Sequence, residues 1–420
     1  MVESEGTRKG AGITSPHFLP SQAAARGIIF DLGSRNDRDT VVKNLETGEW
    51  EVLADGAYPV YSPSGHILYQ TNRYQSGLWA LPFSIETLKA TGEAFPIVEN
   101  VGGPSVGADG TLVYLDFLRG EGQQLVWRDR GGKKLEVIGQ PQEIIRFLAL
   151  SPDGGRVAVQ GFEDDNDDIW VHEVARPLKR RLTFHAEVDG QPVWSPSGKE
   201  ITFRSSRQRN DDDIYSRAAD GTGEPALLAG ADLEERPHDS SPDGNYLLYE
   251  VIDPENGRDL WYLKRKEAGG GFDSVPFIQT PFNEYAAKFS PQGRFVAYVS
   301  DQSGQNQVYA RLFPEGEGQW QVSTQGGVQP RWSRDGKELF YVEGDTLMAV
   351  EVSTSPSFTS GATTRLFQHP NLRAPVEHRY DVSRDGQRFV LVETVESEEA
   401  KASSIHVVEN WLAEFRDRQD

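Results

Sequence analysis

The segment Gly103-Pro104-Ser105-Val106-Gly107 matches the Gly-x-Ser-x-Gly pattern that presents a nucleophilic serine in many hydrolases. Such a serine needs a sharp strand-to-helix turn that lifts it above a sheet, and a histidine and an acid that activate it. No helical pattern follows this segment, and Pro104 lies at the same place in its repeat as Pro192 does in another. We therefore expect a structural part of a repeat, without a catalytic role.

An acidic loop at residues 163–168 offers the carboxylates that a calcium ion prefers. The residues with the alternating spacing of a calcium loop are Asp164, Asn166 and Asp168. Ile169 stands where such a loop has its glycine, and Ala175 stands where it has its closing glutamate, so the full motif fails. We expect a solvated turn here and no cofactor, with calcium as the alternative.

The composition excludes several classes of partner. The chain has 420 residues, with 64 acidic and 43 basic side chains and a formal charge of −21. Nucleic acids and anionic membranes repel such a chain unless basic residues gather on one face, and no basic run is longer than the one in segment 178–182. Cysteine is absent, which excludes disulfides and thiolate metal sites.

No apolar stretch reaches the ~20 residues that span a bilayer, and the acidic start does not fit a secretory signal. We expect a globular monomer that does not insert into membranes.

A tetrapeptide of the type Ser-Pro-Asp-Gly recurs along nearly the whole chain, at steps of 43 to 50 residues. Perfect copies begin at Ser151 and Ser241, looser copies at Ser62, Ser195, Ser290, Ser333 and Ser383, and decayed forms at Leu19 and Gly107. The intervals contain short apolar segments separated by turns, typically four of them. This pattern is typical of one β-propeller blade per repeat.

A blade cannot bury both faces of its sheet alone, so neighbouring blades must stack, and a closed ring removes the exposed ends. We predict an all-β fold: a single β-propeller of four-stranded blades with a short C-terminal helix. We expect nine blades if the N-terminal segment around Gly10 to Ser15 supplies the missing outer strand of the last unit, and eight if the poorly matched first unit completes the ring instead. The predicted boundaries are 1–15 for the N-terminal segment, 16–404 for the propeller repeats, and 405–420 for the last strand and the helix.

The units resemble the TolB-like propeller repeat, in which Trp-Ser-Pro-Asp-Gly precedes an apolar strand, Asp-Ile-Tyr/Trp and Leu-Thr. The corresponding segments here include Trp194-Ser195-Pro196, Asp168-Ile169-Trp170, Asp213-Ile214-Tyr215 and Leu182-Thr183. The order of segments is also similar to the propeller C-terminal to the kinase domain and membrane helix of bacterial Ser/Thr protein kinases, as at 44–48, 280–284 and 381–389. The resemblance implies a sensing or interaction region in an extracytoplasmic or periplasmic location. No kinase signature occurs in the chain, so kinase activity is not implied.

The segments that join the outer strand of one blade to the inner strand of the next carry acids at similar positions in the repeat. These candidate ligand-binding residues are Glu187, Asp189, Glu234, Glu235, Glu284 and Glu377. In a propeller such connections gather at one mouth of the central channel, where like charges attract cations or a basic peptide terminus. In the alternative, each acid caps its own turn or pairs with a local arginine such as Arg236 or Arg331.

Two further groups of residues have structural explanations. His185, His238 and His378 would bind a metal ion if they clustered, but they lie in three different units, so we expect surface histidines and no metal site. Aromatic residues recur at one position of the third strand, at Trp79, Trp127, Trp170, Tyr215, Trp261 and Tyr309. We expect them to pack between blades, with a carbohydrate platform as the alternative.

We therefore predict a non-enzymatic propeller that binds a protein, a peptide or an envelope-derived small ligand at a channel mouth. The alternative is a hydrolase or lyase that acts on a glycan or lactone in the central channel. The third class of function is a purely structural spacer, and such a protein would have no deep charged pocket.

Overall fold

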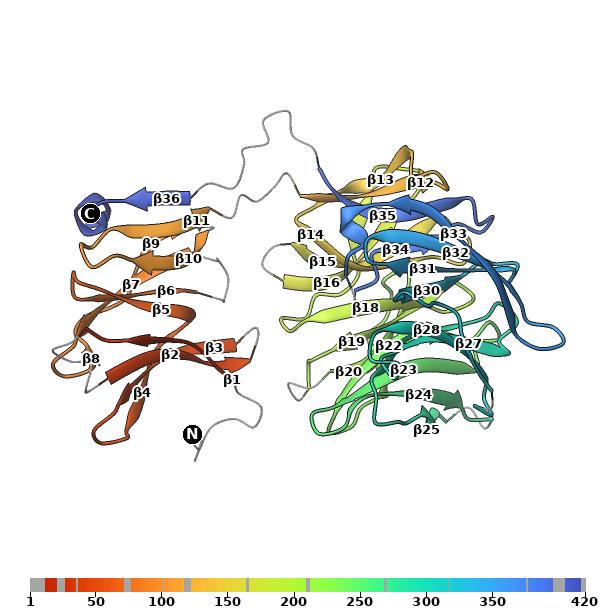
Figure 1. Ribbon diagram of the computed structural model, residues 1–420, viewed down its shortest axis with the longest axis horizontal. Coiled ribbons are helices and arrows are strands. Elements are labelled where there is room, and N and C mark those ends of the chain that lie inside the picture. The colour runs from red at the N-terminus through yellow and green to blue at the C-terminus, as the bar shows by residue number, and fades with distance from the viewer. Residues whose placement is uncertain are drawn as a thin grey trace. The chain divides into compact units, whose positions relative to one another are not determined.

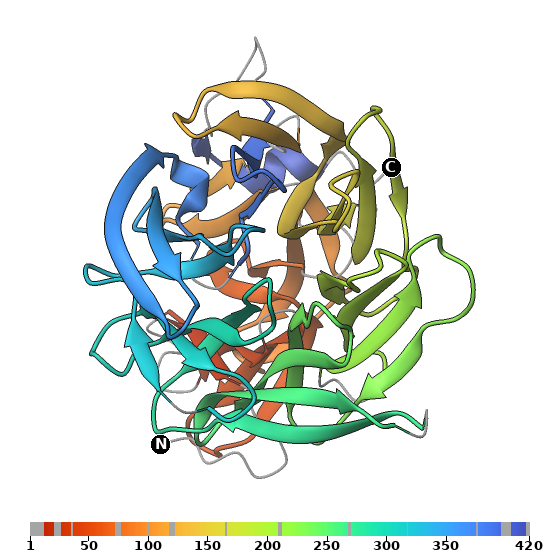
Figure 2. The same ribbon diagram turned by 90° about the vertical axis from the view of Figure 1, so that its right-hand side faces the viewer.

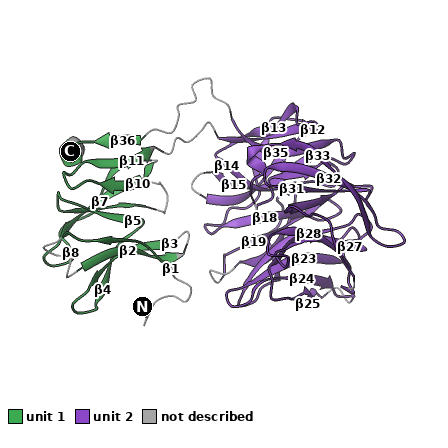
Figure 3. Ribbon diagram, viewed as in Figure 1, with its two compact units in different colours: residues 1–119, 397–420 green, residues 120–396 purple. Residues whose placement is uncertain are grey.

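The computed structural model describes residues 12–20, 27–34, 37–71, 77–99, 101–116, 122–163, 166–208, 212–267, 270–316, 318–374, 377–395 and 405–416. The chain forms two compact units (Figure 3). Unit 1 comprises residues 1–119 and 397–420, and unit 2 comprises residues 120–396. Unit 2 is thus inserted, along the chain, between the two parts of unit 1. In the described residues, no helix is long and apolar enough to cross a membrane.

Unit 1 contains three antiparallel sheets and one short helix among its described residues (Figure 1). The first sheet has the order β1 (Gly12–Phe18), β2 (Gly27–Ser34), β3 (Asp37–Asn44) and β4 (Trp50–Asp55). The second contains β5 (Ala57–Ser62), β6 (His66–Gln70), β7 (Gly77–Ser84) and β8 (Lys89–Ala90), with β9 (Phe95–Glu99) also paired to β7. The third contains β10 (Val101–Val106), β11 (Leu112–Asp116) and β36 (Ile405–Val408), and the helix α1 (Trp411–Arg416) follows β36.

Unit 2 contains six four-stranded sheets, which Figure 2 shows arranged around a ring. Five of them follow the chain, from the inner to the outer strand. They are β14 (Ile144–Leu150) to β15 (Arg156–Glu163), β16 (Asn166–Glu173) and β17 (Lys179–Arg181); β18 (Asp189–Trp194), β19 (Glu200–Ser205), β20 (Asp213–Ala218) and β21 (Ala226–Ala229); β22 (Glu234–Ser240), β23 (Tyr246–Asp253), β24 (Gly257–Arg265) and β25 (Phe272–Ile278); β26 (Glu284–Phe289), β27 (Phe295–Ser300), β28 (Gln307–Leu312) and β29 (Gln319–Gln321); and β30 (Val328–Trp332), β31 (Glu338–Glu343), β32 (Thr346–Ser353) and β33 (Thr359–Gln368).

The sixth sheet closes the ring with strands from both ends of unit 2. Its order is β34 (Tyr380–Val382), β35 (Arg388–Thr394), β12 (Gln123–Asp129) and β13 (Lys134–Gln142). The pairing of β12 with β35 runs without interruption from Gln123↔Thr394 to Asp129↔Arg388. A short 3₁₀ helix, η1 (Pro370–Leu372), precedes β34. The first and last strands of the ring are therefore hydrogen-bonded neighbours, and the ring has no open edge between blades.

The predicted all-β propeller fold, with four-stranded blades and a short C-terminal helix, is confirmed. The difference lies in how the nine sheets of the described residues are divided: three lie in unit 1 and six close into a ring in unit 2. Strand β1 pairs with β2 of its own sheet, and the last repeat pairs with β12. The N-terminal segment therefore contributes β1 to the first sheet of unit 1, and not the missing outer strand of the last repeat. Residues 1–11 of that segment lie outside the described residues.

The recurring tetrapeptide makes the turn between the first and second strands of a blade. In the copy at Ser151, the amide of Gly154 donates to the carbonyl of Ser151 at 2.8 Å, and Gly154 has φ +76°. Asp153 accepts hydrogen bonds from the Ser151 hydroxyl at 2.5 Å and from the Gly155 amide at 3.0 Å. Serine, aspartate and glycine thus each stabilise the turn in this copy, which explains why the pattern recurs along the chain.

The hydrophobic core lies between adjacent blades, as the recurrent aromatics predict. One buried cluster combines Trp127 and Leu125 of the closing sheet with Ile145, Val157 and Trp170 of the next blade. Four of the six recurrent aromatics are buried, namely Trp127, Trp170, Tyr215 and Tyr309, and the other two are half-buried. Their apolar rings therefore stabilise the stacking of blades.

Candidate functional site

The predicted acids occupy one position of the repeat in unit 2. Asp189, Glu235, Glu284 and Glu377 each precede the tetrapeptide serine of their blade by six residues. Asp189 begins β18 and Glu284 begins β26, while Glu235 is the second residue of β22 and Glu377 lies just before β34. They therefore lie at, or just before, the same end of the innermost strands of four blades.

A kink interrupts three of the inner strands, two residues after Asp189 and Glu284 and at the corresponding position of β30. Gln191, Ala286 and Gln329 have φ values of 53°, 55° and 56°, and the strand pairing is interrupted at each of these points. Such a bulge re-aims the strand end and separates it from the regular ladder. The strand β22 of Glu235 is interrupted later, between Pro237 and Asp239, so the position of the acids does not depend on one shared bulge.

Asp189 is fully buried, and an arginine neutralises it. Arg207 donates to both carboxylate oxygens of Asp189 at 3.0 Å each. The guanidinium of Arg207 also lies over the Tyr215 ring, 4.5 Å from its centroid, which holds the arginine in place. Asp189 is therefore a structural residue of its blade, as the local-pairing alternative predicts.

Three of the other acids are exposed or paired with neighbours. Glu187 is exposed, and its backbone N–H donates to Nδ1 of His185 at 3.1 Å. Glu234 accepts a hydrogen bond from Arg236 at 2.6 Å, and Glu377 forms an ion pair with Arg379. Among the described residues, no hydrogen bond or ion pair joins these three acids to the buried ones. These three acids can therefore contribute only the weak attraction of solvent-exposed charges to a ligand.

Glu235 has a different environment. Only 4% of its surface is exposed, and its Oε2 atom has no hydrogen-bond partner among the described residues. Burial, and to a smaller extent the nearby charge of Asp213, together raise the pKa of Glu235 to about 7. A carboxyl group held in this way is partly protonated at neutral pH and strongly favours a cation that reaches it.

Glu284, which lies in the next blade, has an environment similar to that of Glu235. It is 1% exposed, and its Oε1 atom accepts hydrogen bonds from the hydroxyls of Thr280 at 2.7 Å and Ser300 at 3.0 Å. Its Oε2 atom has no hydrogen-bond partner among the residues that the structure describes. Burial raises the pKa of Glu284, and the charges of Asp259 and Asp301 add to this effect.

Each of these acids lies near an acid of the preceding blade. The pairs that interact electrostatically are Asp168 with Asp189, Asp213 with Glu235, and Asp259 with Glu284. In the first pair, arginines bind both members, since Arg181 binds Asp168 at 2.5 Å. Glu235 and Glu284 have no ion pair of this kind in the described part of the chain. The uncompensated negative charge of the site is therefore concentrated at two consecutive blades.

The loop considered for calcium is held by internal hydrogen bonds. The Asn166 amide donates to Asp168 at 3.0 Å and to the carbonyl of His185 at 2.6 Å. Asp168 also accepts from the Thr183 hydroxyl at 2.9 Å. Asp164 lies outside the described residues. Among those described, no group of three histidine or acidic residues is arranged to hold a metal ion.

A second charged group lies on the inner strands, and the sequence analysis missed it. Asp239, Lys288, Arg331 and Asp381 each precede a tetrapeptide serine by two residues. Lys288 Nζ lies 3.6 Å from Asp239, and Arg331 Nε lies 3.4 Å from Asp381. In other blades the same position holds an apolar residue, Ala149 or Val193. The change from apolar to charged residues was the sequence signal that could have revealed this group.

The prediction of surface histidines is wrong for two of the three. His238 is 2% exposed and His378 is 7% exposed. His238 Nδ1 accepts from the Ala287 amide at 3.2 Å, and its Nε2 lies 3.5 Å from Glu250. Burial and the charges of Arg331, Lys288 and His238 hold the pKa of His378 well below its usual range. Both histidines belong to the polar interior of the ring.

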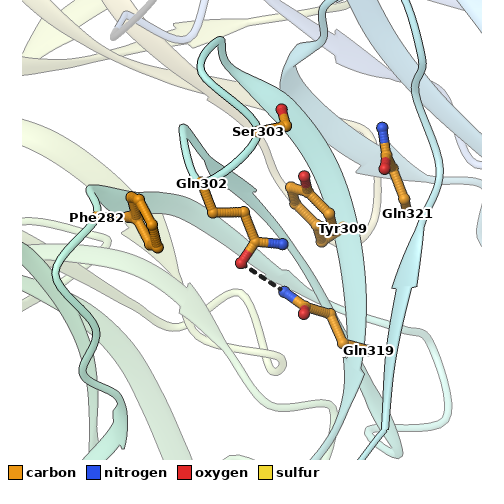
Figure 4. Close-up of a pocket in the computed structure, with 6 residues that line it drawn as sticks. All are labelled: Phe282, Gln302, Ser303, Tyr309, Gln319 and Gln321. Carbon is orange, nitrogen blue, oxygen red and sulfur yellow. Dashed lines mark hydrogen bonds between the residues drawn. The ribbon is translucent and has the colours of Figure 1, made fainter.

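Unit 2 also has an open surface hollow that the sequence analysis did not predict. It is lined by Phe282, Gln302, Ser303, Tyr309, Gln319 and Gln321 (Figure 4). Phe282 comes from the connection that precedes β26, and the others come from the β27–β28 loop and from β28 and β29. The hollow lies close to Glu284 along the chain, since Phe282 precedes Glu284 by two residues. No periodic signal marks these residues in the sequence.

The Gly103–Gly107 segment has the structure expected for a repeat. It lies at the end of β10 and in the turn that leads to β11, with no helix after it in the described residues. Gly103 has φ +64° and occupies the bulge position that Gln191 occupies in unit 2. The serine therefore lacks the strand-to-helix turn that a nucleophile needs.

Comparison with known proteins supports the resemblance to TolB. A stretch of 85 residues, 20% of this chain, is 31% identical to the Tol-Pal system protein TolB of Alcanivorax borkumensis. A stretch of 120 residues, 28% of this chain, is 29% identical to the same protein of Anaeromyxobacter sp. (strain K). These matches span only 20% and 27% of the relatives' own lengths. No family model matches the chain.

A solved structure of a protein assigned as TolB from Agrobacterium tumefaciens shows the same fold. The TM-score is 0.52 at 16% identity, and the alignment covers 66% of this chain and 99% of that one. Identity at this level establishes the fold and not the activity. Together with the matched sequence stretches, the fold shows that this chain is a β-propeller protein similar to TolB.

Proposed function

We propose that unit 2 is a non-enzymatic binding module, which holds a cationic group of a protein or peptide partner at Glu235 and Glu284. The observation that carries the proposal is the unbonded carboxylate oxygen in each of these buried side chains. Buried polar atoms are nearly always hydrogen-bonded, and a buried carboxylate without a partner is costly. An ammonium or guanidinium group supplies the missing hydrogen bonds and the missing charge.

The partner belongs, in this proposal, to the bacterial envelope. The matched relatives are named for the Tol-Pal system, which suggests a protein partner there. The order of segments resembles that in the propellers of membrane Ser/Thr kinases, which suggests that this module is the sensing or interaction region of such a kinase. The coding sequence upstream of Met1 tests this link, since a kinase domain and a membrane helix there would support it and an unrelated reading frame would contradict it.

The binding site is tested with a fluorescent peptide that carries four lysines and a free amino terminus. At low ionic strength we expect Glu235→Gln and Glu284→Gln each to weaken binding about tenfold, because each loses a charge-assisted hydrogen bond worth ~1.4 kcal/mol or more. Glu136→Gln is the matched control, since Glu136 is an exposed residue of the outer strand β13 in another blade.

Equal affinity in all variants, or an equal loss in the Glu136→Gln control, would contradict a site at Glu235 and Glu284. Such a result would mean that the peptide responds only to net charge. A lysine-free peptide of the same length must bind less tightly than the basic one for the proposal to hold.

The second candidate is a hydrolase or lyase that acts on a glycan or lactone. A carboxyl group with a pKa of about 7 beside a second acid is the arrangement that general acid catalysis uses. Turnover of polygalacturonate or of a γ-lactone by the intact chain, lost in Glu235→Gln, would establish this function in place of simple binding.

A further inference from the structure

The open hollow of unit 2 is uncharged, in a chain with a formal charge of −21. Its six lining residues are three glutamines, a serine, a tyrosine and a phenylalanine. Figure 4 shows the Phe282 ring on one side and the Gln321 amide on the other, with Gln302 and Gln319 between them. A charged ligand would find no counter-charge among these side chains, so the lining favours a neutral, hydroxyl-rich ligand.

The amide groups of the hollow are held in place but not saturated. The Gln319 amide nitrogen donates to the Tyr298 hydroxyl at 2.7 Å and to Gln302 Oε1 at 3.2 Å. The Gln321 amide nitrogen donates to the carbonyl of Ser323 at 2.8 Å. These bonds leave acceptor capacity on Gln319 and Gln321 and donor capacity on Gln302. An amide presents a donor and an acceptor side by side, which matches two adjacent hydroxyls of a sugar ring.

Phe282 gives the hollow an exposed aromatic face. Its side chain is 41% exposed, although it is a large apolar group. Its backbone N–H donates to the Thr280 hydroxyl at 3.2 Å, and the next residue, Asn283, is bound to Asp301 by hydrogen bonds of 2.9 and 2.7 Å. The connection that carries the ring is therefore fixed before a ligand arrives, which reduces the entropic cost of stacking a sugar on it.

We propose that this hollow is a binding subsite for a neutral oligosaccharide. The sugar ring stacks on Phe282, and its hydroxyls bind the amides of Gln302, Gln319 and Gln321. A peptide is a poorer occupant, because the hollow is open and offers no enclosed apolar pocket for a side chain. This inference goes beyond the cation site at Glu235 and Glu284 and does not depend on it.

The test uses the full chain and three neutral oligosaccharides, namely chitohexaose, cellohexaose and maltohexaose, in isothermal titrations. We expect at least one of them to bind. Phe282→Ala should weaken its binding about tenfold, or ~1.4 kcal/mol, which is about half of the free energy gained when a phenylalanine side chain is fully buried. Gln319→Ala should weaken it about three- to tenfold, as expected for one or two hydrogen bonds.

The matched control is Gln305→Ala, because Gln305 is an exposed glutamine of the same β27–β28 loop but does not line the hollow. Its affinity should equal that of the unaltered chain. Glu235→Gln should also bind the oligosaccharide normally, so that a failure of the cation site and a failure of this subsite are distinguishable.

Failure of all three oligosaccharides to bind would overturn the proposal, and so would binding that survives both Phe282→Ala and Gln319→Ala. Preference for an acidic oligosaccharide such as hexagalacturonate would overturn it as well, since the lining provides no cation. Protection of Gln302 and Gln319 amide signals by a peptide and by no sugar would assign the hollow to a peptide instead.

Discussion

The indole N–H of Trp411 donates a hydrogen bond to the hydroxyl of Ser62 at 3.1 Å, which joins residues 349 positions apart in unit 1. Trp411 is 1% exposed, and its ring meets the His66 ring edge to face, 5.5 Å between centroids. The helix α1 is thus docked on the second sheet of unit 1, next to the tetrapeptide turn of that sheet.

Trp411→Ala should destabilise unit 1 by about 3–5 kcal/mol, because a large buried ring is replaced by a cavity. Trp411→Phe keeps most of the ring, loses the hydrogen bond, and should cost only about 1 kcal/mol. Hydrogen exchange of the β6 and β11 amides measures the effect, with the β27 amides of unit 2 as an internal reference. Unchanged protection in Trp411→Ala would show that the helix does not hold these strands.

Stability should depend on pH through Glu235. The unfolded chain binds this proton with a pKa of 4.5 and the folded chain with a pKa of about 7, so the folded state binds more protons between these values. The contribution of Glu235 to the free energy of unfolding therefore falls as the pH rises through this window, by an amount on the order of 3 kcal/mol. Burial raises the pKa of Glu284 too, which acts in the same direction.

Denaturant unfolding of the chain and of Glu235→Gln at a series of pH values measures this dependence. Glu235→Gln should be the more stable protein above pH 7, and the difference should shrink as the pH falls toward 4.5. A difference that is constant with pH would mean that Glu235 titrates normally. Glu136→Gln again serves as a control for the loss of one negative charge.

Thr183→Val should destabilise the blade β14–β17 by about 1–3 kcal/mol. The hydroxyl of Thr183 donates to Asp168 at 2.9 Å and accepts from the Ile169 amide at 3.0 Å, and valine preserves the shape but neither bond. Thr183→Ser retains the hydroxyl and should cost much less. Denaturant unfolding followed by tryptophan fluorescence measures both, and equal losses in the two variants would assign the effect to packing.

Lys288→Met should destabilise unit 2 by about 1–3 kcal/mol, because the half-buried Asp239 loses the cation 3.6 Å away and keeps only the hydrogen bond from the Phe289 amide and the charge of Arg331. Burial raises the pKa of Asp239 and lowers the pKa of Lys288, so each depends on the other for its charged state. The double variant with Asp239→Asn should recover part of the loss. A double-mutant cycle in denaturant measures the coupling, and strictly additive losses would show that the two groups do not interact.

The segment 120–396 should fold when it is expressed alone. Its first and last strands pair directly, from Gln123↔Thr394 to Asp129↔Arg388, so excision leaves the six-bladed ring complete. We expect one cooperative unfolding transition and a native-like pattern of β-strand amide protection. Aggregation of this segment, with normal solubility of the full chain, would show that unit 1 is needed to hold the ring together.

The blades themselves could be predicted because their signal is local. Ser151, Asp153 and Gly154 each make a contact within the same turn, so their types and spacing are dictated by a few neighbouring atoms. The ring closure could not be predicted in this way. Pairing of β12 with β35 depends on residues more than 250 positions apart, and nothing in either strand distinguishes it from the corresponding strands of other blades.

The candidate site was predictable only in part, for the same reason. Asp189, Glu235 and Glu284 share one position in the repeat, which the sequence reveals. Their different environments depend on residues outside that pattern: Arg207 neutralises Asp189, whereas Glu235 meets a second acid. The hollow at Phe282 depends on side chains brought together from loops of irregular length, so no repeat marks it.

The insertion of unit 2 within unit 1 has a consequence for biosynthesis. A ribosome completes the six-bladed ring when residue 396 has emerged, but the third sheet of unit 1 still lacks β36 until the last residues of the chain are made. Domains generally fold as they leave the ribosome, so the later part of the sequence folds before the earlier part is finished. A chain that stops before β36 would leave β11 paired with β10 alone, and the exposed edge of β11 would be open to pairing with another chain.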